Sequence, residues 1–112
     1  MAPNNGAISE DDFEGLPGAE LVRQGLSDLR AGELSEYALL VLVAGPRLRG
    51  LGIDVPNRDD IPRPFEHRLY KELENAYGDS AYSRYNSLIR RIVSFAQALA
   101  RERVSTRSFP FA

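Results

Sequence analysis

The chain has 112 residues, of which 43% are hydrophobic and 27% are charged, and its net charge is −2 at neutral pH. This length leaves room for one domain, and this composition predicts a packed core rather than disorder. The chain has no cysteine, which excludes disulfides, thiolate metal ligands and thiol nucleophiles. No apolar run approaches the roughly 20 residues of a membrane span, and the N-terminus has no signal-peptide pattern, so we expect a cytoplasmic protein.

Residues 1–18 are rich in glycine, proline and acidic residues. This composition predicts a flexible acidic lead-in. An amphipathic helix is predicted over 19–31, because its apolar residues fall on one side at 100° per residue. Gly25 lies within that apolar stripe, which predicts the close approach of a neighbouring helix.

Ser35 is a candidate N-cap for a helix over 36–44, whose residues 37–44 are apolar on every side. A helix of this kind belongs at the centre of a fold. A buried strand is the alternative, because periodicity does not separate the two over so short a run. The prolines of 52–64 indicate an ordered connection, and a further amphipathic helix is predicted over 64–77.

The last predicted helix, 80–104, has the strongest pattern. Its apolar residues fill one unbroken arc of the helix. They are Tyr82, Tyr85, Leu88, Ile89, Ile92, Val93, Phe95, Ala96, Leu99 and Ala100. At 1.5 Å per residue the helix is about 37 Å long, slightly more than the diameter of a compact chain of this size. A protruding apolar end would need a second chain to cover it, which favours a homodimer.

Few residues are candidates for chemistry. Glu66 falls within the apolar arc of its helix, so it is either a buried carboxylate or a first-turn glutamate that folds back on backbone amides. His67, the only histidine, falls on the polar side with no metal-ligand spacing, and we expect it to be exposed and without function. We therefore predict no catalytic residue, no metal and no cofactor, and a hydrolase around Glu66 and His67 is a remote alternative.

Charge is distributed unevenly, since residues 84–112 hold six arginines against one acidic residue. Four of these arginines lie on the outward face of the last helix and could follow phosphates: Arg84, Arg90, Arg91 and Arg101. The simpler interpretation is that these arginines form a solvent-exposed face whose positive charge partly balances the acidic N-terminal half of the chain. In the tail, 105–112, Phe109 and Phe111 flank a proline and could dock on this domain or in a partner.

The sequence thus predicts an all-α domain, 19–104, built from four principal helices, with 36–44 at the centre and 80–104 as the longest element. The favoured function is a non-enzymatic interaction or assembly protein that binds a protein partner or itself as a homodimer. A nucleic-acid-associated regulator that uses the basic face of the last helix is the alternative, and no membrane association is expected.

Overall fold

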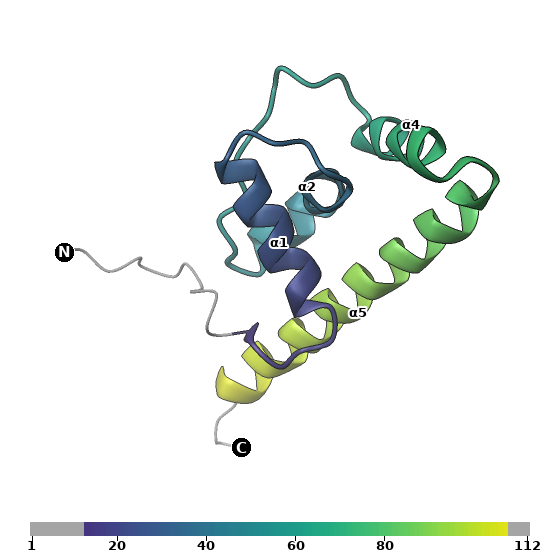
Figure 1. Ribbon diagram of the computed structural model, residues 1–112. Helices are drawn as coiled ribbons and strands as arrows, with labels where there is room; N and C mark the ends of the chain where they lie inside the picture. Colours follow the sequence, from purple (N-terminus) through teal and green to yellow (C-terminus); the bar gives the residue numbers. More distant parts are fainter. Residues whose placement is uncertain (1–12, 108–112) are drawn as a thin grey trace.

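The computed structural model describes residues 13–107, with side chains described as far as residue 102. Within this part the chain is helical without strands, which confirms the predicted class (Figure 1). The elements are α1 (Ala19–Arg30), α2 (Glu36–Val43), α3 (Gly45–Gly50), α4 (Phe65–Tyr77), the 3₁₀ turn η2 (Gly78–Ser80) and α5 (Ala81–Arg107). The four predicted helices correspond to α1, α2, α4 and α5, with ends that agree within three residues.

Helix α2 forms the centre of the fold. The hydroxyl of Ser35 accepts a hydrogen bond from the amide of Ala38 at 3.1 Å, which caps the helix as predicted. All side chains of residues 38–42 are buried, on every side of the helix. The helical interpretation of this apolar run is therefore correct, and the alternative of a buried strand is wrong.

Helix α1 packs directly on α2, and Gly25 lies where the two helices meet. A Cβ atom at Gly25 would lie 2.4 Å from Cγ2 of Val41 and 2.5 Å from the carbonyl oxygen of Tyr37. Real Cβ atoms do not approach other atoms so closely. The predicted close approach of a neighbouring helix is thus confirmed, and Gly25 is required for it.

The connection between α3 and α4 contributes to the core. Ile53, Val55 and Ile61 are buried although they lie outside any helix. Arg49 at the end of α3 holds this segment, because its Nε donates a hydrogen bond of 3.0 Å to the carbonyl oxygen of Val55. The prolines of this segment therefore belong to an ordered connection, as predicted.

Helix α5 lies along one side of the molecule and forms a V with α4 (Figure 1). Leu88, Ile92, Phe95 and Leu99 make its buried face. At the edge of the predicted apolar arc the prediction is wrong, because Tyr82 is 66% exposed and Val93 is 44% exposed. These positions lie roughly 120° round the helix from the buried face, beyond the reach of the helices packed on that face.

The packed part of the chain starts before α1. Phe13 is completely buried, and its ring meets the ring of Phe95 edge to face at a centroid distance of 5.1 Å. Ala98, which the sequence pattern puts on the polar side of α5, is also buried. Residues 13–18 thus cover part of α5, although their composition groups them with the lead-in 1–18.

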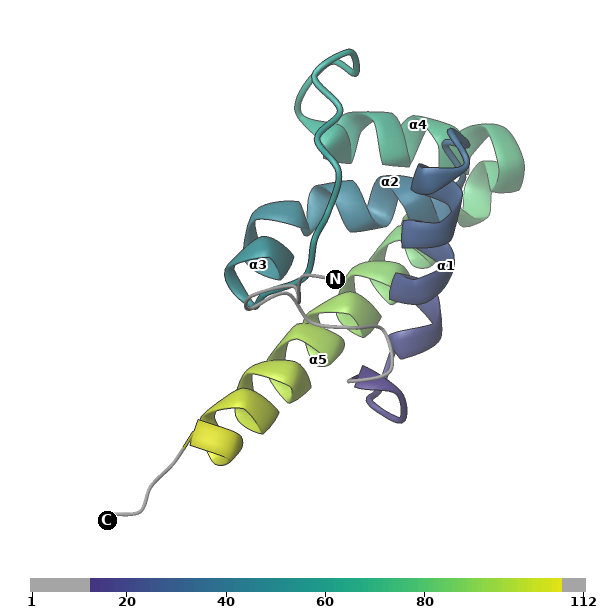
Figure 2. The same cartoon turned by 90° about the vertical axis from the view of Figure 1, so that its left-hand side faces the viewer.

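The long axis of the molecule is set by α5. Its 27 residues span about 40 Å, and its last turns extend past the other helices (Figure 2). The Cα radius of gyration is 15.1 Å, larger than the roughly 13 Å of a compact domain of this size. Among the described residues no helix has the length and apolar character needed to cross a membrane.

Candidate functional site

Arg84, the first of the four predicted arginines, belongs to an internal network. Its Nε donates to Oε1 of Glu36 at 3.0 Å, and its Nη2 donates to the hydroxyl of Tyr37 at 3.3 Å. The hydroxyl of Tyr77 donates to the other oxygen of Glu36 at 2.9 Å. The guanidinium group also lies over the Tyr77 ring, 5.2 Å from its centre. Arg84 thus joins α5 to the first turn of α2.

The positive charge of Arg84 and the negative charge of Glu36 stabilise each other. The hydrogen bond to the Glu36 carboxylate raises the pKa of Arg84, and the same carboxylate raises the pKa of Tyr77. Both the Arg84 and Glu36 side chains are less than one third exposed. Because solvent screens a half-buried pair only partly, this ion pair contributes more to stability than a surface pair does.

We expect Arg84→Ala to lower the free energy of unfolding by about 1 to 2 kcal/mol, because the Glu36 carboxylate keeps its burial and loses its charged donor. The matched variant Arg90→Ala, on the same helix, should change it by less than about 0.5 kcal/mol. Urea unfolding followed by circular dichroism measures both values. Equal stability of the two variants would show that the network contributes nothing.

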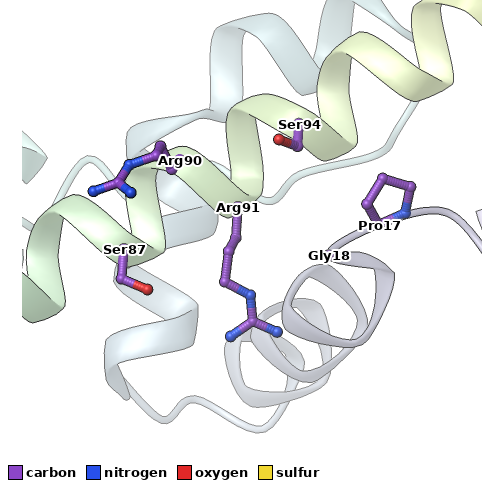
Figure 3. Close-up of a pocket in the computed structure, with 6 residues that line it drawn as sticks. All are labelled: Pro17, Gly18, Ser87, Arg90, Arg91 and Ser94. Atoms are coloured by element: carbon purple, nitrogen blue, oxygen red, sulfur yellow. The ribbon is translucent and has the colours of Figure 1, made fainter.

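Arg91 is paired as well. Its Nη2 lies 2.6 Å from Oε2 of Glu20 in the first turn of α1. This contact lies beside a shallow groove of about 270 Å³ between α5 and the start of α1 (Figure 3). Its lining residues are Pro17, Gly18, Ser87, Arg90, Arg91 and Ser94. In Figure 3 the guanidinium groups of Arg90 and Arg91 point in different directions, so they do not converge on one anion.

Arg90 and Arg101 remain open to solvent. Among the described side chains, neither forms an ion pair. Arg101 lines a second shallow pocket with Leu16, Ala98 and Glu102, so an acidic residue is close to it. Of the predicted row of four arginines, two therefore have no ion pair among the described residues, and one of these, Arg101, lies near Glu102.

The remaining candidates have separate outcomes. Phe109 and Phe111 lie outside the described residues. Glu66 is exposed, so the hypothesis of a buried carboxylate is wrong. The physical reason is that only Leu69 and Leu73 of α4 are fully enclosed, whereas Glu66 lies one turn nearer the open start of the helix. His67 is exposed, as predicted. Within residues 13–107 no three carboxylates or imidazoles are grouped as a metal site.

The structure exposes apolar side chains along one line of α5. We call Tyr82, Ile89, Val93 and Ala100 the α5 strip. At 100° per residue these positions fall within about 40° of one another, and they extend over about 27 Å of the helix. Tyr82 and Val93 are exposed, and Ile89 and Ala100 are half-buried. Asn86 borders the strip between its first two members.

The sequence pattern predicts that the α5 strip lies in the core, because its members continue the apolar arc. The signal that distinguishes them is their place at the edge of the arc, in spacings of seven, four and seven residues.

Comparison with known proteins finds no matching family model, no matching curated protein and no matching solved structure.

Proposed function

We propose that this protein is a non-enzymatic assembly module that forms a homodimer through the α5 strip. The observation that carries the proposal is the exposure of Tyr82 and Val93 on the line that Ile89 and Ala100 continue. Large apolar side chains that share one continuous line are typical of a helix that packs on another helix.

A second copy of this chain is the partner that fits the strip best. Spacings of seven and four residues return to the same side of a helix, so two α5 helices can align their strips along the full length of both. An isologous contact uses the same surface twice, so the strip itself supplies the complementary partner. No further element of the chain is needed.

Charge on the two flanks of the strip favours a parallel pair. Arg90 lies on one flank. On the other flank is Tyr85, whose pKa is raised by its burial and by the negative charge of Glu66, so an acidic group lies nearby. In a parallel dimer the two-fold axis runs along the helices. The Arg90 flank of each strip then lies next to the Tyr85 flank of the partner's strip. An antiparallel pair centred on the strip would instead bring the two Arg90 side chains together.

The dimer is expected to be weak. The strip has four side chains, of which two are half-buried, so the area that it can bury in a dimer is small. Interfaces with a small buried area are typical of transient complexes. We therefore expect a dissociation constant of the dimer in the micromolar range or above, so that the protein is a monomer at high dilution.

Sedimentation equilibrium over a wide concentration range tests the proposal. Val93→Glu should weaken dimerisation by at least about tenfold, because a carboxylate would be buried without a partner in the interface. Ser94→Glu is the matched control, since it adds the same charge at the adjacent position on another face and should leave dimerisation unchanged. A wild-type chain that stays monomeric at high micromolar concentration would contradict the proposal.

Single cysteines test the orientation, because the natural chain has none. Tyr82→Cys and Val93→Cys should each form a disulfide-linked dimer under mild oxidation if the helices are parallel and in register. In an antiparallel dimer Tyr82 would face the region of Ala100 in the partner, and Tyr82→Cys would not cross-link.

The alternative, a nucleic-acid-associated regulator, receives less support. Binding to a phosphate backbone needs several free cations along one track. Arg84 and Arg91 are engaged by Glu36 and Glu20, which leaves Arg90 and Arg101.

A further inference from the structure

The only lysine and the only histidine of the chain lie in the same pocket. The pocket lies at the start of α4 and has a volume of about 220 Å³. Its lining residues are Pro62, Arg63, Pro64, His67, Arg68 and Lys71. Three of them are permanent cations, a fourth is an imidazole, and none of the six is acidic.

Local structure brings these groups together. His67 and Lys71 are four residues apart on α4, so they lie on the same side of the helix one turn apart. Arg68 follows His67 directly and extends the cationic surface round the helix. Arg63 reaches the pocket from the connection that precedes α4, between two prolines that restrict the backbone there.

Carboxylates pair with two of the three permanent cations at the pocket. Arg63 lies 3.4 Å from Asp59, and Arg68 lies 4.0 Å from Glu72. All four side chains are at least 42% exposed, so these pairs are weak and can open at little cost. Among the described residues, Lys71 and His67 have no ion-pair partner.

The backbone adds to the attraction for an anion. Pro64 precedes α4, and no side chain caps this end of the helix. The helix dipole puts partial positive charge at this end of α4, where the amide of His67 already donates to the carbonyl oxygen of Pro64 and Glu66 lies in the first turn. The groove between α1 and α5 lacks this combination, since a carboxylate already occupies Arg91.

We infer that this pocket binds the phosphate group of a small molecule. Lys71 supplies a point charge, His67 donates a hydrogen bond through a ring N–H, and Arg63 offers the planar donor pair that matches two phosphate oxygens. The pocket admits a phosphate with a few attached atoms, and it is not part of the α5 strip. The inference therefore stands independently of the proposed dimer.

Titration of the full chain with inorganic phosphate and with phenyl phosphate, followed by NMR, tests the inference. Because His67 is the only histidine, its imidazole resonances report this pocket without ambiguity. We expect both compounds to shift them saturably in the millimolar range. Tighter binding of phenyl phosphate would show that the pocket also contacts the organic part of the ligand, and equal binding would show that it recognises the phosphate group alone.

Lys71→Gln should weaken phosphate binding by about tenfold, because one charge-assisted contact is lost. Arg101→Gln is the matched control, since it removes one positive charge from a distant exposed site and should leave binding unchanged. Val93→Glu should bind phosphate as the natural chain does, which separates this site from the dimer. Linear shifts without saturation, or equal loss in both glutamine variants, would overturn the inference. Tighter binding of an RNA oligomer that requires Arg101 as well would also overturn it.

Discussion

Phe13→Ala is expected to lower the free energy of unfolding by about 3 to 5 kcal/mol, the usual effect of removing a fully enclosed phenyl ring. Phe13 has no exposed surface, and its ring packs edge to face on Phe95 at an interplanar angle of 88°. A domain of this size has a total stability of roughly 5 to 15 kcal/mol. The substitution would therefore leave a large fraction of the chain unfolded near physiological temperature.

Urea unfolding at constant temperature measures this loss. Leu16→Ala, three residues further on, is the matched control, because Leu16 is only half-buried and should contribute about 1 kcal/mol. If Phe13→Ala were as mild as Leu16→Ala, the segment before α1 would not be docked on α5.

Gly25→Ala is the second large effect, with an expected loss of about 2 to 3 kcal/mol. Alanine favours a helix over glycine by about 1 kcal/mol, so propensity alone predicts the opposite sign. Steric overlap decides the outcome, because the new methyl group would lie 2.5 Å from the backbone oxygen of Tyr37. That oxygen moves only if α1 and α2 separate, which removes packing along both helices.

Gly50→Ala provides the comparison for Gly25→Ala. Gly50 is also helical, and a Cβ atom there would meet nothing within 4 Å. We expect this variant to be neutral or stabilised by up to about 1 kcal/mol. Opposite signs in thermal unfolding would confirm the close contact, and a stabilised Gly25→Ala would contradict it.

Most of the fold could be predicted because local signals and burial agree. Ser35 has the chemistry of an N-cap, residues 37–44 are too apolar to lie anywhere but inside, and Gly25 interrupts an apolar stripe for a steric reason. Phe13 could not be placed, because its burial depends on Phe95, and no local pattern connects residues that lie so far apart in sequence.

The candidate site was harder to predict. A helical projection gives the direction of a side chain but not which neighbour covers it, so it placed Tyr82 inside and Ala98 outside. It also left Arg84 as a free cation, because Glu36 and Tyr37 reach it only in three dimensions. The pocket at Lys71 was missed for a related reason. Arg63 precedes α4 in an irregular segment, where periodicity carries no information.

The contacts of α5 have a consequence for how the chain is made. Glu36 and Arg84 are 48 positions apart, and Glu20 and Arg91 are 71 positions apart. The hydrogen bond that links α1 to the N-cap of α2, from the Ser35 hydroxyl to the Asp28 carboxylate, spans only seven positions. During synthesis, α1 and α2 can therefore pair with each other before the residues of α5 have been added to the chain. Until the final helix emerges, the nascent chain presents the apolar surface that this helix will later cover. That interval is when the chain is most exposed to aggregation and to chaperones.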